Sequence, residues 1–279
     1  MSDTTRPALP DPAPGSGASD ARRPDAAAGC PADGAPTSRL VQPQRRRLLL
    51  AAAALPLASA CSTTAPIAAP AAAPAELPGA PRVRAGDRWR YVEINAYNGI
   101  AQAEVACEAV SVAPQLRVRL TDSRGRARAD ELYDGAWRVV QEPFYDYVQF
   151  FQQPMPLLPD ALVPGARSRV RGTFAVPQWS GDRFDWDQWL DARGWERVRV
   201  PAGEFDALRV ERRIWFTHPD RQRLYPMRVD TAWYAPAVDR WVRREWTGTY
   251  RWAGTRRGAP MREDWVVWEL LDHVRAPMG

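Results

Sequence analysis

The chain contains no lysine, only two histidines and only three cysteines among its 279 residues. All 38 basic residues are therefore arginine, which indicates a GC-rich genome and says nothing about function. His218 and His273 lie far apart in the sequence with no cysteine near either, so no common metal-ligand spacing occurs. The chain also lacks a G-x-S-x-G nucleophile elbow. We therefore expect no metal, no cofactor and no serine-nucleophile chemistry.

The basic character of the chain does not predict a nucleic-acid partner. The formal net charge is +5, but residues after Cys61 hold 31 arginines against 28 acidic residues. These charges alternate along the sequence, whereas nucleic-acid binding needs a clustered basic patch. We expect no nucleic acid among the partners.

Long apolar runs are missing too. The most apolar stretch, Leu48–Ala58, has eleven residues, whereas a membrane-spanning helix needs about 20. Arg45-Arg46-Arg47 precedes it and Ala58-Ser59-Ala60-Cys61 follows. This order is typical of a cleaved export signal, and it resembles the bacterial lipobox, with Ala58 where leucine is usual. The resemblance implies that cleavage leaves Cys61 first and lipidated; the alternative is an ordinary secretory signal.

Four segments follow from this signal. Residues 1–40 are rich in Pro, Ala, Gly and Asp, which predicts disorder, and they are not translated if the start lies near Val41. Residues 41–60 form the signal peptide, which also resembles a twin-arginine signal; Sec export is the other route. Residues 61–81 are the lipidated cysteine and an Ala/Pro-rich tether, and residues 82–279 are a β domain. Ser62 favours the outer membrane, because inner-membrane retention usually needs aspartate there.

The β domain is expected to be all-β and antiparallel throughout. Asn98-Gly99 between two apolar stretches predicts a hairpin, because both turn positions favour positive φ. Leu116, Val118 and Leu120 alternate with polar residues, as in a half-buried strand. Pro143–Pro164 is rich in aromatic residues and prolines and predicts a long loop or a short helix. We expect one curved antiparallel sheet, a half-barrel or a sandwich of about 10–11 strands.

Two segments resemble an uncharacterised family of bacterial envelope lipoproteins. Val200–Val210 is similar to its V-P-A-G-x-F-x-A signature, and Trp233–Val242 is similar to the Y-A-P-x-V-x-R-x-V segment that follows. The resemblance covers roughly residues 195–245. It implies a periplasmic β domain similar to the lipoprotein-carrier half-barrels, and it implies no known activity.

Two arginines interrupt apolar strand faces. Arg212 lies among Leu208, Val210, Ile214 and Phe216, and Arg244 lies between Val242 and Trp246. A buried guanidinium needs an acid, water or a ligand as its partner. One interpretation is structural: an ion pair, with Glu93 and Glu269 as candidate acids, or a β-bulge that turns the arginine outward. The other is a ligand site in which Arg212 and Arg244 hold an anionic head group against Trp246.

Other candidates for chemistry are weaker. Asp185 and Asp187 lie beside Trp186 and Trp189, which would suit a carbohydrate-active or cell-wall enzyme with two carboxylates. Cys107 lies on the apolar face of a strand, which predicts a small buried side chain. We therefore expect a non-enzymatic outer-membrane lipoprotein that faces the periplasm and binds an amphiphile or an envelope partner. The alternatives are that enzyme and a scaffold that uses a sheet edge.

Overall fold

The computed structural model describes residues 67–277 except 136, 144–146, 180 and 255–257. Cys61 and the predicted signal peptide lie outside these residues, and the described residues belong to one compact unit. The strands are β1 (Ala68–Pro70), β2 (Arg88–Asn95), β3 (Ile100–Ser111), β4 (Leu116–Asp122), β5 (Glu131–Tyr133), β6 (Arg138–Glu142), β7 (Gln149–Pro156), β8 (Arg167–Ala175), β9 (Phe184–Val200), β10 (Gly203–Phe216), β11 (Arg223–Ala235), β12 (Arg240–Trp252), β13 (Met261–Arg262) and β14 (Val266–Val274). Among the described residues, no helix is long and apolar enough to cross a bilayer.

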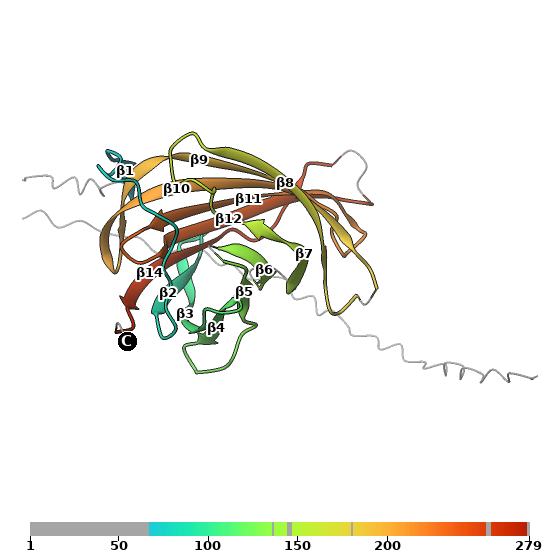
Figure 1. Ribbon diagram of the computed structural model, residues 1–279. Helices are drawn as coiled ribbons and strands as arrows, with labels where there is room; N and C mark the ends of the chain where they lie inside the picture. Colours follow the sequence, from blue (N-terminus) through green and yellow to red (C-terminus); the bar gives the residue numbers. More distant parts are fainter. Residues whose placement is uncertain (1–66, 136, 144–146, 180, 255–257, 278–279) are drawn as a thin grey trace, which may run out of the picture. The chain divides into compact units, whose positions relative to one another are not determined.

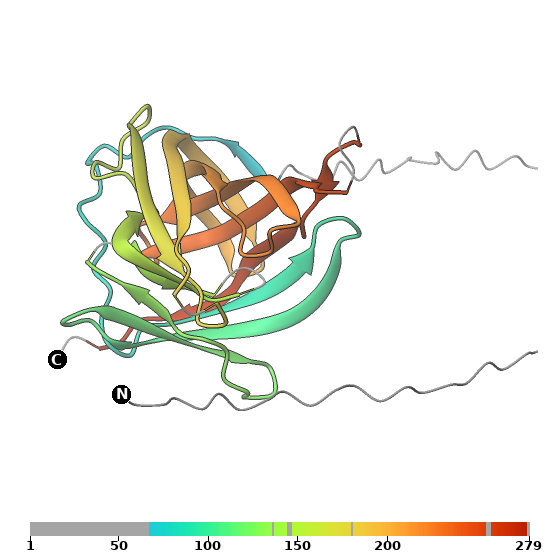
Figure 2. The same cartoon turned by 90° about the vertical axis from the view of Figure 1, so that its right-hand side faces the viewer.

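Twelve of these strands close into an antiparallel barrel (Figures 1 and 2). Around the ring the order is β9, β10, β11, β12, β14, β2, β3, β4, β5, β6, β7 and β8, and β8 pairs with β9 to close it. The outer strands β1 and β13 add to β9 and β12. The all-β prediction is confirmed. The finer expectation of a half-barrel or sandwich needs correction, because closure leaves no open edge between β8 and β9.

Closure depends on β7 and on the first half of β9, neither of which was predicted as a strand, whereas Trp195–Val200 of β9 was. In the first half of β9, inward side chains alternate with outward aspartates, and this period of two is the pattern that predicts a strand. The inward side chains are Phe184, Trp186, Gln188 and Leu190. The other missed strand is β7, which lies where a loop or short helix was expected. Pro154 falls in the register break between β6 and β7, and Pro156, paired with Arg138, is the last residue of the strand. Proline is tolerated at such positions because it does not interrupt a continuous ladder.

Part of the predicted tether lies on the barrel. Strand β1 pairs with Glu196–Val198 of β9, beyond the reach of β8, and the amide of Arg199 donates to the carbonyl of Ile67. Ala68 and Ala71 pack against the core. The chain therefore reaches the barrel at Ile67, close to the β9–β10 turn.

The two ends of the barrel differ. One end, which we call the plugged end, carries the β9–β10 and β11–β12 turns, and these turns lie in Val200–Val210 and Trp233–Val242. Buried aromatic rings fill it, with the rings of Trp137 and Trp241 5.2 Å apart. The indole nitrogens of Trp89 and Trp137 donate to the carbonyls of Val238 and Asp239. The opposite end, the mouth, is formed by the β2–β3, β10–β11 and β12–β14 connections.

Candidate functional site

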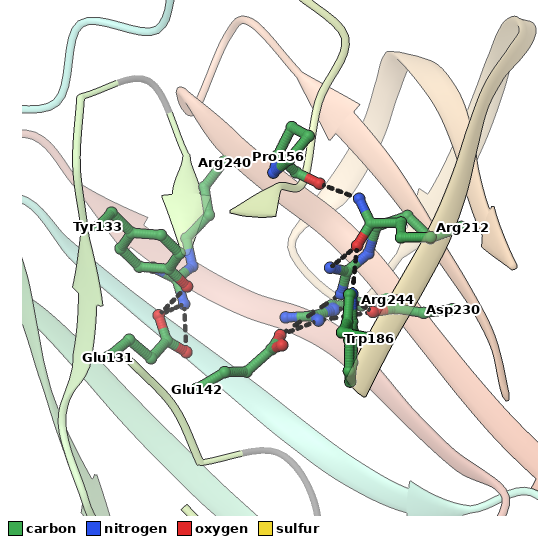
Figure 3. A network of polar contacts seen from close by, with 10 residues as sticks. Glu131, Tyr133, Glu142, Pro156, Trp186, Arg212, Asp230, Arg240 and Arg244 are labelled. Carbon is green, nitrogen blue, oxygen red and sulfur yellow. Dashed lines mark hydrogen bonds and ion pairs between the residues drawn. The ribbon is translucent and has the colours of Figure 1, made fainter. Parts of the chain in front are cut away.

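A buried cluster of four charged side chains lies inside the barrel (Figure 3). Arg212 of β10 and Asp230 of β11 are cross-strand partners and form an ion pair. Arg244 of β12 donates to Asp230 through Nε at 3.1 Å and through Nη2 at 2.6 Å. Arg244 also donates to Glu142 of β6, on the far side of the ring. None of the four side chains is more than 3% exposed.

Electrostatics keep Asp230 ionised. Burial alone would raise the pKa of Asp230, but the charges of Arg212 and Arg244 outweigh it and lower that pKa to about 2. Two arginines therefore face two carboxylates, so the formal charge of the cluster is zero. A neutral, hydrogen-bonded cluster is how buried guanidinium groups are tolerated.

A polar layer surrounds the cluster. Gln188 of β9 donates to the carbonyl of Pro156 at 2.6 Å, and its oxygen accepts from the Trp186 indole at 3.2 Å and from Arg212 at 3.4 Å. Gln149, the cross-strand partner of Glu142, is fully buried. Within the described part of the chain, neither amide atom of Gln149 has a hydrogen-bond partner, and neither does Oε2 of Glu142. On the β6–β7 side of the interior, these buried polar atoms therefore have no hydrogen-bond partner among the described residues.

The acids suggested from sequence pair elsewhere. Glu93 accepts hydrogen bonds from Arg128 and from the indole of Trp268, both at 2.9 Å. Glu269 is bound by Arg243 on the neighbouring strand. The carboxylates that meet Arg212 and Arg244 are Asp230 and Glu142. The alternation along β11 predicts that Asp230 points into the barrel. No local pattern predicts Glu142 as a partner of these arginines, because its strand, β6, lies on the opposite side of the ring.

A second buried ion pair lies near the plugged end. Nη2 of Arg240 donates to both carboxylate oxygens of Glu131 of β5, at 3.0 and 2.7 Å, and both side chains are fully buried. The guanidinium carbon lies 4.0 Å from the ring centre of Trp241 and 5.0 Å from that of Trp137. Burial would lower the pKa of Arg240, but the charge of Glu131 raises it overall. This pair ties opposite parts of the ring together inside an aromatic cage.

Cys107 lies beside this cage. It is a free thiol, 1% exposed, with its sulfur 4.0 Å from Nη2 of Arg240. Burial raises the pKa of this thiol to about 12. The side chain is therefore the small buried residue that the strand pattern predicts.

A cavity of about 730 Å³ opens at the mouth. This volume suits a small organic ligand. One wall is aromatic, with Trp246, Trp268 and Tyr250 from β12 and β14 and Tyr147 from the β6–β7 connection. Exposed polar side chains lie at its edge, among them Gln102, Gln178, Arg262 and Asp264. The cavity thus joins an apolar wall to a polar rim.

Charges on the cavity wall are mostly paired. Glu93 is bound by Arg128, and Glu263 accepts hydrogen bonds from Nε and Nη2 of Arg228 at 2.5 and 3.2 Å. The Arg223 guanidinium lies 4.9 Å from the Tyr250 ring centre. Arg262 is exposed and, among the described residues, makes no ion pair. Four arginines and three acids line the cavity, so it is slightly basic.

The structure separates the three residues predicted to bind a ligand. Trp246 lines the cavity, and its ring lies 5.9 Å from that of Trp268 in an edge-on arrangement. Arg244, two residues away on the same inward face, is 1% exposed and belongs to the charged cluster. Arg212 is bound into the same cluster. The structure therefore shows these arginines as partners of carboxylates, with only the tryptophan at the cavity.

The acidic pair on β9 does not face a cleft. Asp185 and Asp187 lie on the outer face of the barrel, whereas Trp186 between them points inward. Asp187 is bound by Arg169 at 2.9 and 2.5 Å, which lowers the pKa of that carboxyl. Among the described residues, no group of three or more His, Cys, Asp or Glu side chains could hold a metal ion.

Comparison with known proteins reveals only distant structural likeness. No protein-family description matches the sequence. No curated protein matches it either. One similar solved structure is a lipoprotein candidate from Parabacteroides distasonis, with 12% identity, a TM-score of 0.40, and coverage of 70% of this chain and 97% of that one. Another, an exported-protein candidate with a YmcC-like fold from Bacteroides fragilis, has 13% identity, a TM-score of 0.44, and coverage of 71% and 99%.

Proposed function

We propose that this chain is a lipid-anchored protein of the bacterial outer membrane whose barrel faces the periplasm and binds an amphiphile in the mouth cavity. It acts as a binding protein and not as an enzyme. The observation that carries the proposal is the cavity itself, because it combines an aromatic wall with an arginine-bearing rim. An acyl or other apolar group would lie against Trp246 and Trp268, and a polar head group would meet Arg262 at the rim.

The anchor is supported by sequence. Cys61 follows an eleven-residue apolar stretch and small residues, as in a lipoprotein signal. Only residues 62–66 separate it from Ile67, where the chain meets the barrel. Six residue steps span roughly 20 Å at most. The tether would therefore keep the barrel beside the anchoring bilayer.

The cavity is tested on residues 62–279, which contain the closed sheet and its core. Native mass spectrometry of this part, exported behind a cleavable secretory signal and purified from the periplasm, is expected to show a bound mass that organic extraction removes. The emptied barrel should then bind a fluorescent fatty acid, and Trp246→Leu should weaken that binding at least about tenfold. Trp189→Leu is the matched control, because this ring is 48% exposed on the outer face. An extracted barrel that neither retained a ligand nor bound the probe would contradict the proposal.

The anchor has a separate test. The full chain should incorporate labelled palmitate in bacteria and fractionate with the outer membrane. Cys61→Ser should abolish labelling and release the chain from the membrane. Labelling that survives this substitution would place the lipid elsewhere, and fractionation with the inner membrane would contradict the proposed location.

A further inference from the structure

One corner of the mouth exposes large apolar side chains next to arginines that lack acidic partners. The apolar side chains are Leu224, Tyr225, Trp252 and Met261, with exposures of 39%, 80%, 41% and 49%. They come from β11, β12 and β13, which are hydrogen-bonded neighbours. We call them, together with Arg221, Arg251 and Arg262, the mouth patch.

The arginines of the mouth patch differ from most others on the barrel. Along the outer wall, exposed arginines pair with acids across strands, as in Arg88–Glu108, Arg197–Asp206 and Arg199–Glu204. Arg221, Arg251 and Arg262 are exposed and, within the part of the chain that the structure describes, form no ion pair. Their charge is therefore available to an anionic partner.

The backbone is strained where it presents Tyr225. The pairing of β11 with β12 shifts register between Leu224 and Met227, which marks a bulge. Tyr225 in this bulge has a φ of 52°, an unfavourable conformation for a bulky residue. Such strain persists only where the surroundings hold it, and it occurs preferentially at functional positions. Here it places an aromatic ring almost fully in solvent.

We propose that the mouth patch docks on an anionic lipid surface. Tyrosine and tryptophan favour the interface between water and lipid, because each combines an apolar ring with a polar atom. Unpaired arginines beside them add attraction to acidic head groups. The patch adjoins the cavity, since Arg262 belongs to both and Tyr250, which lines the cavity, pairs with Met261. An amphiphile could thus pass from the lipid surface into the barrel without crossing bulk water.

The test is sedimentation of residues 62–279 with vesicles. Wild type is expected to bind vesicles with about 30% phosphatidylglycerol, to bind pure phosphatidylcholine weakly, and to be released by 0.5 M salt. Tyr225→Asn should reduce binding while easing the backbone, because asparagine tolerates positive φ. Arg221→Gln with Arg251→Gln should weaken binding roughly 25-fold, since each arginine near such a surface contributes a factor of about five.

The control variants make the same kinds of substitution, of arginines and of an aromatic residue, at positions away from the mouth. Arg82→Gln with Arg119→Gln removes two exposed arginines that also lack ion pairs among the described residues. Trp189→Asn removes an exposed ring from the outer wall. Both should bind vesicles within about twofold of wild type. Equal loss in these controls, or no preference for anionic vesicles, would overturn the proposal.

Two further measurements distinguish lipid docking from ligand binding in the cavity and from self-association. Trp246→Leu should lose the cavity ligand and still bind vesicles, so failure of the cavity would not mimic failure of the patch. Sedimentation velocity without vesicles tests self-association. A dimer that Tyr225→Asn abolishes would assign the patch to a second copy of the chain and would overturn lipid docking.

Discussion

Glu142 on β6 accepts a hydrogen bond from Arg244 on β12. These two strands lie opposite each other in the ring of twelve. Five strands separate them in either direction around the wall. Arg240 and Glu131 span the interior in a similar way nearer the plugged end. A barrel of twelve strands encloses a wide interior. Long charged side chains occupy part of this volume, which apolar side chains would otherwise have to fill. The charged clusters thus leave the cavity confined to the mouth.

Removing one member of the central cluster should cost much more than removing an exposed ion pair. Asp230→Asn leaves Arg212 and Arg244 with one carboxylate, and breaking a buried pair costs about 3 to 5 kcal/mol. Urea unfolding of residues 62–279 measures this loss. Asp206→Asn breaks only the exposed pair with Arg197 and should cost less than about 1 kcal/mol. Equal losses would mean that the central cluster contributes no more than a surface pair.

Acid should destabilise the barrel in a defined range. The folded pKa of Asp230 is about 2, below the value of about 3.9 for an unfolded aspartate. The stability that this carboxylate contributes is therefore complete above about pH 4 and is lost as the pH falls from 4 towards 2. Thermal unfolding followed by tryptophan fluorescence should show a falling midpoint over that range. A midpoint that is flat between pH 4 and 2 would contradict the shift.

Gln149 should be dispensable for stability. Its buried amide lacks a partner among the described residues, and an unsatisfied buried polar group costs about 1 to 3 kcal/mol. Gln149→Met keeps the length of the side chain and should raise the free energy of unfolding by about 1 kcal/mol. Gln188→Met is the matched control, because both amide atoms of Gln188 make hydrogen bonds and their loss should destabilise the barrel. Destabilisation by both variants would show that Gln149 is satisfied in solution.

Cys107 should be unreactive while the barrel is folded. Its pKa of about 12 leaves almost no thiolate at pH 8, and the sulfur is buried. Ellman's reagent should therefore label residues 62–279 slowly in buffer and rapidly in 8 M urea. This part holds no other cysteine, so the signal reports one site. Rapid labelling in buffer would mean that the β2–β3 region opens readily.

Several features were predictable because they follow from local pattern. The alternation in β10 and β12 identified Arg212 and Arg244 as inward charges and Trp246 as an inward aromatic ring. Asn98-Gly99 predicted the β2–β3 hairpin, where Gly99 has a φ of 71°. The same rule applied to Phe184–Leu190 would have found the start of β9. In that segment Asp185 and Asp187 occupy outward positions of the alternation.

By itself the sequence determined the all-β class, the inward faces of the long strands and the candidate lipid site at Cys61. These depend on neighbouring residues, since alternation sets which side of a strand is apolar and a signal is a contiguous stretch. Only the tertiary structure decided that the sheet closes, that Glu142 and Asp230 neutralise the two arginines, and that the cavity lies above them at the mouth. Closure depends on pairing β8 with β9, and Glu142 of β6 reaches Arg244 of β12 only across the interior. Such contacts are fixed by the geometry of the whole ring, which no local pattern specifies.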